Sequence, residues 1–288
     1  MFYSLRILVT AVFTAVTVAC GRTITDTRPV LVVSLEPQCY LLEQIAGDEF
    51  RIITLLPNGE NPEIFEPSMA KRMEVDNCEV YFAIGYLPFE ENIASSSNGK
   101  VKIVKTTDGI KPEFGTHCSH HHGYSHHIHD VDPHMWTSVR NARQMCSVMK
   151  ESLQAINPDS ADIYELRFRR FDSHLDSLDN AFSQRLGTVK DRPFMVWHPS
   201  LTYFARDYDL RQISVSQYNK ENSMIELRNV IDSACAAGAK VFFSQRDYDA
   251  RQAITIATNI GARLVAVNPC SYSWEYELNN IVDELCKP

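Results

Sequence analysis

The feature that most constrains the fold is one long amphipathic pattern in the middle of the chain. From Asn157 to Leu186, apolar residues recur mostly three or four positions apart. This spacing predicts one helix of roughly 30 residues, about 45 Å long, with Asn157 as its cap and Pro158 in its first turn. Such a helix exceeds the usual length inside one compact domain, so it is either a coiled-coil segment or a strut. We predict a strut over residues 157–188, because strand-and-helix patterning resumes after it.

Short apolar runs alternate with amphipathic stretches on both sides of this helix. Before it, we expect strands at residues 30–34, 50–56, 80–84 and 101–104, with helices at 39–46 and 67–75. After it, we expect strands at residues 194–197, 212–215, 241–244 and 264–267, with helices at 223–237, 248–259 and 274–286. Strands separated by helices predict mainly parallel sheets. The sequence therefore predicts an α/β protein of two lobes, residues 20–156 and 189–288, joined by one long backbone helix.

The first residues are typical of an export signal. Arg6 supplies positive charge, and about 13 apolar residues follow, a run too short to remain in a bilayer as a spanning helix. Small residues before Cys20 resemble a bacterial lipobox, although Thr17 stands where leucine is usual. We predict that residues 1–19 are removed and that Cys20 carries a lipid. The alternative is an ordinary secretory signal with an incidental cysteine.

Composition excludes several classes of function. The 288 residues carry a net charge of −8, whereas a protein that binds nucleic acid needs a basic face. Apolar residues make up 44% and charged residues 22%, as in a soluble globular protein. Of the eight cysteines, none belongs to a Cys-x-x-Cys pair, so neither a zinc finger nor a thioredoxin site is indicated.

The densest chemical signal is a histidine tract at residues 117–129. Seven of the ten histidines lie in it: His117, His120, His121, His122, His126, His127 and His129. Imidazole suits zinc, copper and nickel, and dense histidine tracts in loops bind such ions loosely. A solvated polar insertion is the alternative. We expect an auxiliary loop that collects metal, with the specific site elsewhere.

A specific site needs single ligands on rigid elements. Three side chains stand at strand-to-helix junctions. Glu63 follows the second strand, His134 closes the histidine loop, and His198 follows the strand at residues 194–197. A lone histidine is more often structural than a ligand. The three side chains form a site only if they converge in space, which the pattern does not show.

The chain resembles the metal-specific substrate-binding proteins of bacterial ABC importers, the zinc and manganese receptors with two α/β lobes and a long connecting helix. The resemblance covers essentially the whole mature chain. Residues 56–67 resemble the family's Pro-x-Gly-x-x-Pro-His-x-(Tyr/Phe)-Glu-Pro segment, and residues 132–136 match its Asp-Pro-His-x-Trp motif. Residues 194–204 resemble the start of the second lobe, and residues 267–269 the late Leu-Asp-Pro segment. A histidine loop before the second motif is typical of zinc-selective members.

Two positions depart from the family pattern. Glu63 stands where the family has a histidine ligand, and Asn268 where an aspartate can be a ligand. The resemblance implies a ligand set of Glu63, His134 and His198. Asn268 would then be a weak ligand, or water, Gln245 or a loop histidine would take its place. This set suits Zn²⁺, which the histidine loop favours, with Mn²⁺ or Fe²⁺ as alternatives.

The resemblance implies a monomeric, lipid-anchored receptor, not an enzyme, that captures a metal ion outside the cytoplasm and delivers it to an ABC importer permease. The connecting helix should limit lobe closure to small tilts. Two alternatives remain open. Two histidines, a glutamate and an open position also suit a zinc-dependent hydrolase, although neither His-Glu-x-x-His nor Gly-x-Ser-x-Gly occurs. A lipoprotein that only buffers metal would carry the same ligands.

Overall fold

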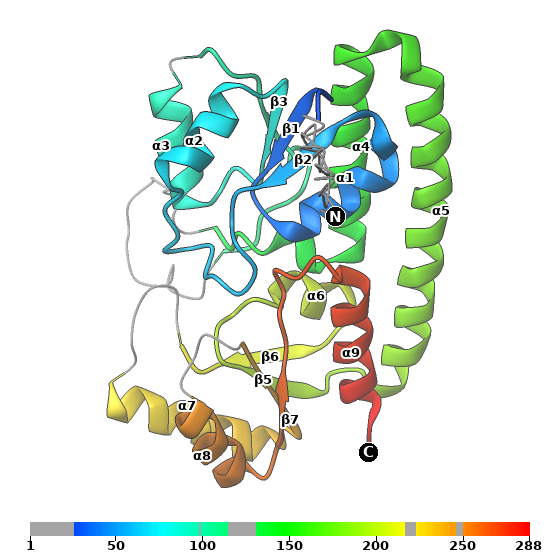
Figure 1. Cartoon of the computed structure of the whole chain (residues 1–288). Helices are drawn as coiled ribbons and strands as arrows, with labels where there is room; N and C mark the ends of the chain where they lie inside the picture. The colour runs from blue at the N-terminus through cyan, green and yellow to red at the C-terminus, as the bar shows by residue number, and fades with distance from the viewer. Residues whose placement is uncertain (1–25, 98, 115–130, 217–222, 246–249) are drawn as a thin grey trace, which may run out of the picture.

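Two parallel sheets form the centres of two lobes in the computed structural model, which describes residues 26–97, 99–114, 131–216, 223–245 and 250–288 (Figure 1). The first sheet has the order β2-β1-β3-β4 and the second the order β6-β5-β7-β8. Their strands are β1 Val30–Val33, β2 Arg51–Thr54, β3 Val80–Ala83, β4 Ile103–Lys105, β5 Pro193–Val196, β6 Arg211–Ser214, β7 Val241–Ser244 and β8 Arg263–Ala266. All strand pairs are parallel, and the strand order switches side between β1 and β3 and between β5 and β7. Ligand sites of open parallel sheets lie beyond the carboxyl ends of the strands at such points.

Helices cover the sheets as the predicted α/β class requires. They are α1 Glu36–Ala46, α2 Met69–Asp76, α3 Pro88–Ser96, α4 Val139–Ile156, α5 Ala161–Leu186, α6 Thr202–Asp207, α7 Met224–Ala237, α8 Ala250–Ile260 and α9 Trp274–Cys286. The predicted fold class of two α/β lobes and one long helix is confirmed. Three helices, α3, α4 and α6, were not among the expected elements. No helix within the described ranges is both long and apolar enough to cross a membrane.

The long helix α5 runs beside both lobes (Figure 1), but it begins later than predicted. A 3₁₀ turn, Pro158–Ser160, precedes it, and Ser160 occupies the cap position. The prediction that Asn157 caps the helix is wrong, because its amide nitrogen donates to the hydroxyls of Ser160 and Tyr164 at 3.1 and 3.0 Å. A cap would accept from helix amides instead.

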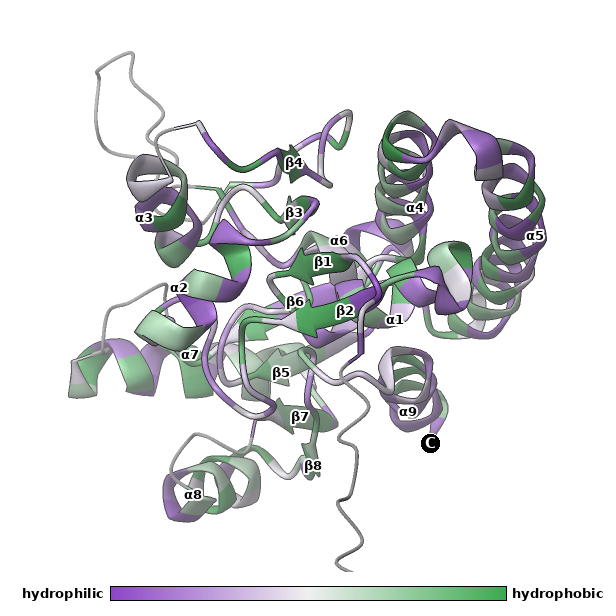
Figure 2. Cartoon of the chain, turned by 45° about the horizontal axis from the view of Figure 1, so that its top comes forward, coloured by the Kyte–Doolittle hydropathy of each residue, from purple (hydrophilic) through white to green (hydrophobic). Residues whose placement is uncertain are grey.

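One apolar core joins the two lobes. A single buried cluster includes Leu31 of the first sheet, Phe243 of the second, Phe171 of α5 and Trp274 of α9. Hydropathy follows this arrangement, because the strands are largely apolar while α4 and α5 carry polar residues on their outer faces (Figure 2). The indole of Trp274 donates to the Trp136 carbonyl at 2.7 Å. Because packed cores resist deformation, these contacts favour small movements between the lobes.

A buried carboxylate anchors the start of α3. Glu90 is 4% exposed and accepts from the Ser34 hydroxyl and from the backbone amides of Ile84, Gly85 and Leu87. Burial raises the pKa of Glu90, and these donors partly offset that effect. The side chain therefore satisfies several backbone donors at the turn between β3 and α3.

Glu90→Gln should lower the free energy of unfolding by about 2–4 kcal/mol, because one amide oxygen cannot serve all the donors that two carboxylate oxygens serve. Urea unfolding of the metal-free protein would measure the loss. The matched control is Glu91→Gln, an exposed glutamate on the same helix, which should stay within about 0.5 kcal/mol of the wild type. Equal stability of E90Q and E91Q would contradict the anchoring role.

Candidate metal centre

Glu63 comes from the loop that follows β2. The Asn61 side-chain oxygen accepts the Glu63 amide at 2.9 Å, a local turn of the kind that asparagine favours. The turn directs the carboxylate inward, and Glu63 is 7% exposed. Ile64, the next residue, is 71% exposed, so the chain turns outward directly after the glutamate.

His134 is fixed by the aspartate two residues before it. Asp132 Oδ1 accepts the His134 amide at 2.9 Å and lies 2.9 Å from His134 Nδ1. Burial lowers the pKa of His134, but the Asp132 carboxylate outweighs burial and leaves that pKa raised. We assign the proton to Nδ1, facing the carboxylate, which leaves Nε2 as the ligand atom.

His198 lies directly beyond the carboxyl end of β5, in the second lobe. Its Nε2 is 2.9 Å from Glu63 Oε1, so this contact crosses between the lobes. The ring centroids of His134 and His198 are 5.2 Å apart. All three side chains are buried, although each is polar.

The three predicted ligands converge on one point. One ligand atom from each of Glu63, His134 and His198 lies within 4.8 Å of the other two. Within the described residues, no second group of His, Cys, Asp or Glu meets this criterion. No donor from those residues reaches the buried Oε2 of Glu63. Because a buried carboxylate oxygen is costly without a partner, the arrangement suits a cation, and the donor set fits Zn²⁺.

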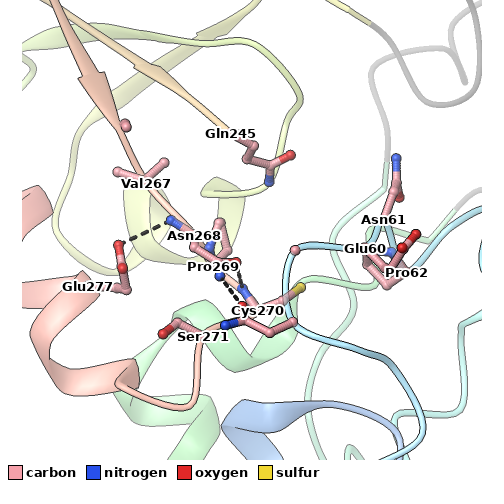
Figure 3. Close-up of a pocket in the computed structure, with 13 residues that line it drawn as sticks. Glu60, Asn61, Pro62, Gln245, Val267, Asn268, Pro269, Cys270, Ser271 and Glu277 are labelled. Carbon is pink, nitrogen blue, oxygen red and sulfur yellow. Dashed lines mark hydrogen bonds between the residues drawn. The ribbon is translucent and has the colours of Figure 1, made fainter. Parts of the chain in front are cut away.

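Asn268 and Gln245 lie together in a pocket of about 390 Å³ between the loop of Glu63 and the end of β8 (Figure 3). Asn268 Nδ2 donates to Asn58 Oδ1 at 2.7 Å, and Asn268 Oδ1 accepts the Cys270 amide at 3.1 Å. Both ends of the Asn268 amide therefore have protein partners. Whether Asn268 or Gln245 binds metal stays a prediction.

Other predicted sites lie outside the described residues. These are the signal segment with Cys20 and the seven histidines of residues 117–129. No disulfide joins the six described cysteines. Two contacts near the site were not foreseen: the contact of Asp132 with His134 and the contact between Asn58 and Asn268. The position of Asp132 in the Asp-Pro-His motif was a usable signal for the first, while nothing in the sequence pairs Asn58 with Asn268.

Asp132→Asn should weaken zinc binding by about 10–100-fold, because a neutral amide supports the His134 imidazole less strongly than a carboxylate does. Isothermal titration with a competing chelator would measure the change. The control is Asp162→Asn, an exposed carboxylate in the first turn of α5, for which we expect the wild-type affinity. An unaltered affinity in D132N would show that Asp132 is not a support for the ligand.

Known proteins of similar sequence and fold bind metals. The chain is 26% identical over 253 residues to a putative metal-binding protein of Treponema pallidum (strain Nichols), covering 84% of this chain and 79% of that protein. It is 25% identical over 252 residues to the zinc-binding lipoprotein AdcA of Streptococcus pneumoniae (strain R6), covering 83% of this chain but 49% of AdcA. The chain thus spans about half the length of that relative.

A solved structure gives the same fold. The crystal structure of ZnuA superposes with a TM-score of 0.80 at 28% identity, over 90% of this chain and 98% of that chain. The sequence pattern of the family described as zinc-uptake complex component A, periplasmic (ZnuA), matches residues 31–278. Apart from Val30 at the start of β1, the matched span contains both sheets, α5 and all three converging side chains. The chain therefore belongs to the ZnuA family of periplasmic zinc-uptake components.

Proposed function

We propose that this protein captures Zn²⁺ outside the cytoplasm and delivers it to an ABC importer permease. The observation that carries the proposal is the convergence of Glu63, His134 and His198, buried and drawn from both lobes, with ligand atoms within 4.8 Å of one another. Membership of a zinc-uptake family supports capture for transport.

Each ligand has a defined part in this proposal. Glu63 and His134 would bind the ion from the first lobe and His198 from the second, so the ion would tie the lobes together. The ion would replace the contact between Glu63 and His198 and satisfy Glu63 Oε2. Two imidazoles and one carboxylate leave a fourth position, as in four-coordinate zinc sites with an exchangeable ligand. A carboxylate also admits Mn²⁺ or Fe²⁺, the alternative cargoes.

The zinc hydrolase would use the same donor atoms, but the family match favours transport over catalysis. A buffering lipoprotein would bind zinc without a permease. Reconstituting the receptor with an ABC importer of the same organism separates these cases, because zinc-stimulated ATP hydrolysis by the importer is expected only for a transport receptor. Metal-dependent ester or peptide hydrolysis by the receptor alone would favour the enzyme instead.

We also propose that the receptor is a monomer anchored by a lipid on Cys20. The relative in S. pneumoniae is described as a lipoprotein, and Cys20 follows a lipobox-like run. Cys20→Ala should move the protein from the membrane fraction to the soluble fraction of the cell envelope. Mass spectrometry of the mature wild-type N-terminus is the second readout, and a Cys20 without a lipid would overturn this proposal.

Replacing the seven histidines of residues 117–129 with serine should remove weak zinc binding and spare the tight site, because Glu63, His134 and His198 already bring three ligand atoms within 4.8 Å of one another. Titration followed by elemental analysis would count both classes of site, and the same titration against Mn²⁺ would identify the cargo. Because serine replaces histidine residue for residue, the segment keeps its length. Any change in zinc binding then comes from the lost imidazoles and not from a shorter chain. Loss of tight binding would show that the loop itself is the receptor site.

A further inference from the structure

The turn that follows β8 touches both ligand-bearing segments of the first lobe. On one side, Trp136 donates its indole hydrogen to the Pro269 carbonyl at 2.8 Å, and Trp136 lies two residues beyond His134. On the other side, Asn268 donates to Asn58, in the loop that leads to Glu63. The second lobe is thereby tied to the first next to His134 and again next to Glu63.

Asn268 is held firmly for this contact. Its backbone amide donates to Glu277 Oε2 of α9 at 3.1 Å, and its side-chain oxygen accepts the Cys270 amide at 3.1 Å (Figure 3). These bonds fix the plane of the carboxamide, so its nitrogen faces Asn58 across the pocket. An amide nitrogen does not bind zinc, and the amide oxygen already has a partner.

We propose that Asn268 is a positioning residue that links the two lobes through Asn58, and that it is not a metal ligand. The inference rests on the proposed function, since it assigns a role beside the proposed zinc site. The link keeps the loop of Glu63 against the second lobe, where His198 lies, and so slows zinc release. Since Asn268 does not bind the ion in this proposal, the fourth coordination position is left to solvent or to another group.

A double-mutant cycle separates a link from a ligand, because coupling appears only between residues that interact. Asn58→Ala and Asn268→Ala should each speed zinc release about fivefold, and the double variant should be no faster than either. Asn58→Asp keeps an acceptor opposite the Asn268 amide and should release zinc within about twofold of the wild-type rate. The control cycle pairs N58A with Thr258→Ala, an exposed residue of α8 whose hydroxyl donates to the Ile254 carbonyl, and should be additive.

The melting temperatures of the same metal-free variants give a second readout that needs no zinc. N58A and N268A should lower the melting temperature by similar, non-additive amounts. If the protein binds no zinc, the proposed function fails, while this thermal cycle still tests the link. Additive effects in both readouts would overturn the inference. A loss of affinity of roughly a hundredfold or more in N268A, with none in N58A, would make Asn268 a ligand and overturn it as well.

Discussion

His198→Ala is expected to abolish tight zinc binding and raise the dissociation constant by roughly a hundred- to a thousandfold. A protein zinc site is worth about 10–16 kcal/mol, so each of three or four ligands contributes about 3–4 kcal/mol. His198 is the only one of the three predicted ligands from the second lobe, so its loss also removes the ion's hold on that lobe. Competition with a chelator of known affinity would measure the constant.

The matched control is His174→Ala. His174 lies on α5, its side chain is 53% exposed, and it contacts Glu275 rather than the metal centre. We expect this variant to bind zinc as the wild type does. A dissociation constant for H198A within about tenfold of the wild type would show that His198 is not a ligand. It would contradict a metal site shared between the lobes.

The fold was largely predictable because its signals are local. Apolar runs marked all eight strands of the described residues, and the three-to-four spacing marked α5. The missed helix α4 carried the same kind of signal, since Val139, Ala142, Cys146, Met149 and Leu153 repeat at helical spacing and Ser138 caps its start. Helix α6, with six residues, is too short for periodicity to show.

The sequence predicts which residues are candidate ligands, but it predicts only part of how they are arranged in space. Position in the chain identified Glu63, His134 and His198 as candidates at strand ends. Their convergence depends on how two sheets pack against α5 and α9, which no local pattern encodes. The same limit applies to Asn268. Its partner Asn58 is distant in sequence, so no local pattern predicts the hydrogen bond between them.

Trp274→Ala should lower the free energy of unfolding by about 3–5 kcal/mol, the usual cost of removing a large aromatic side chain from a core. Trp274 is 2% exposed, stacks on Tyr40 of α1 at 6.2 Å, and donates to the Trp136 carbonyl. It thus packs the start of α9 against the first lobe. Urea unfolding of the metal-free protein would measure the change without a contribution from bound zinc.

Two further variants separate the contribution of the Trp274 hydrogen bond from that of its buried ring. Trp274→Phe keeps an aromatic ring but removes the donor to Trp136, so its loss should be smaller than that of W274A, about 1–3 kcal/mol. Tyr276→Ala removes an aromatic residue of the same helix that is 69% exposed, and should change stability by no more than about 0.5 kcal/mol. If W274A were as mild as Y276A, the junction between α9 and the first lobe would contribute little, and the limit on lobe movement would have to come from α5 instead.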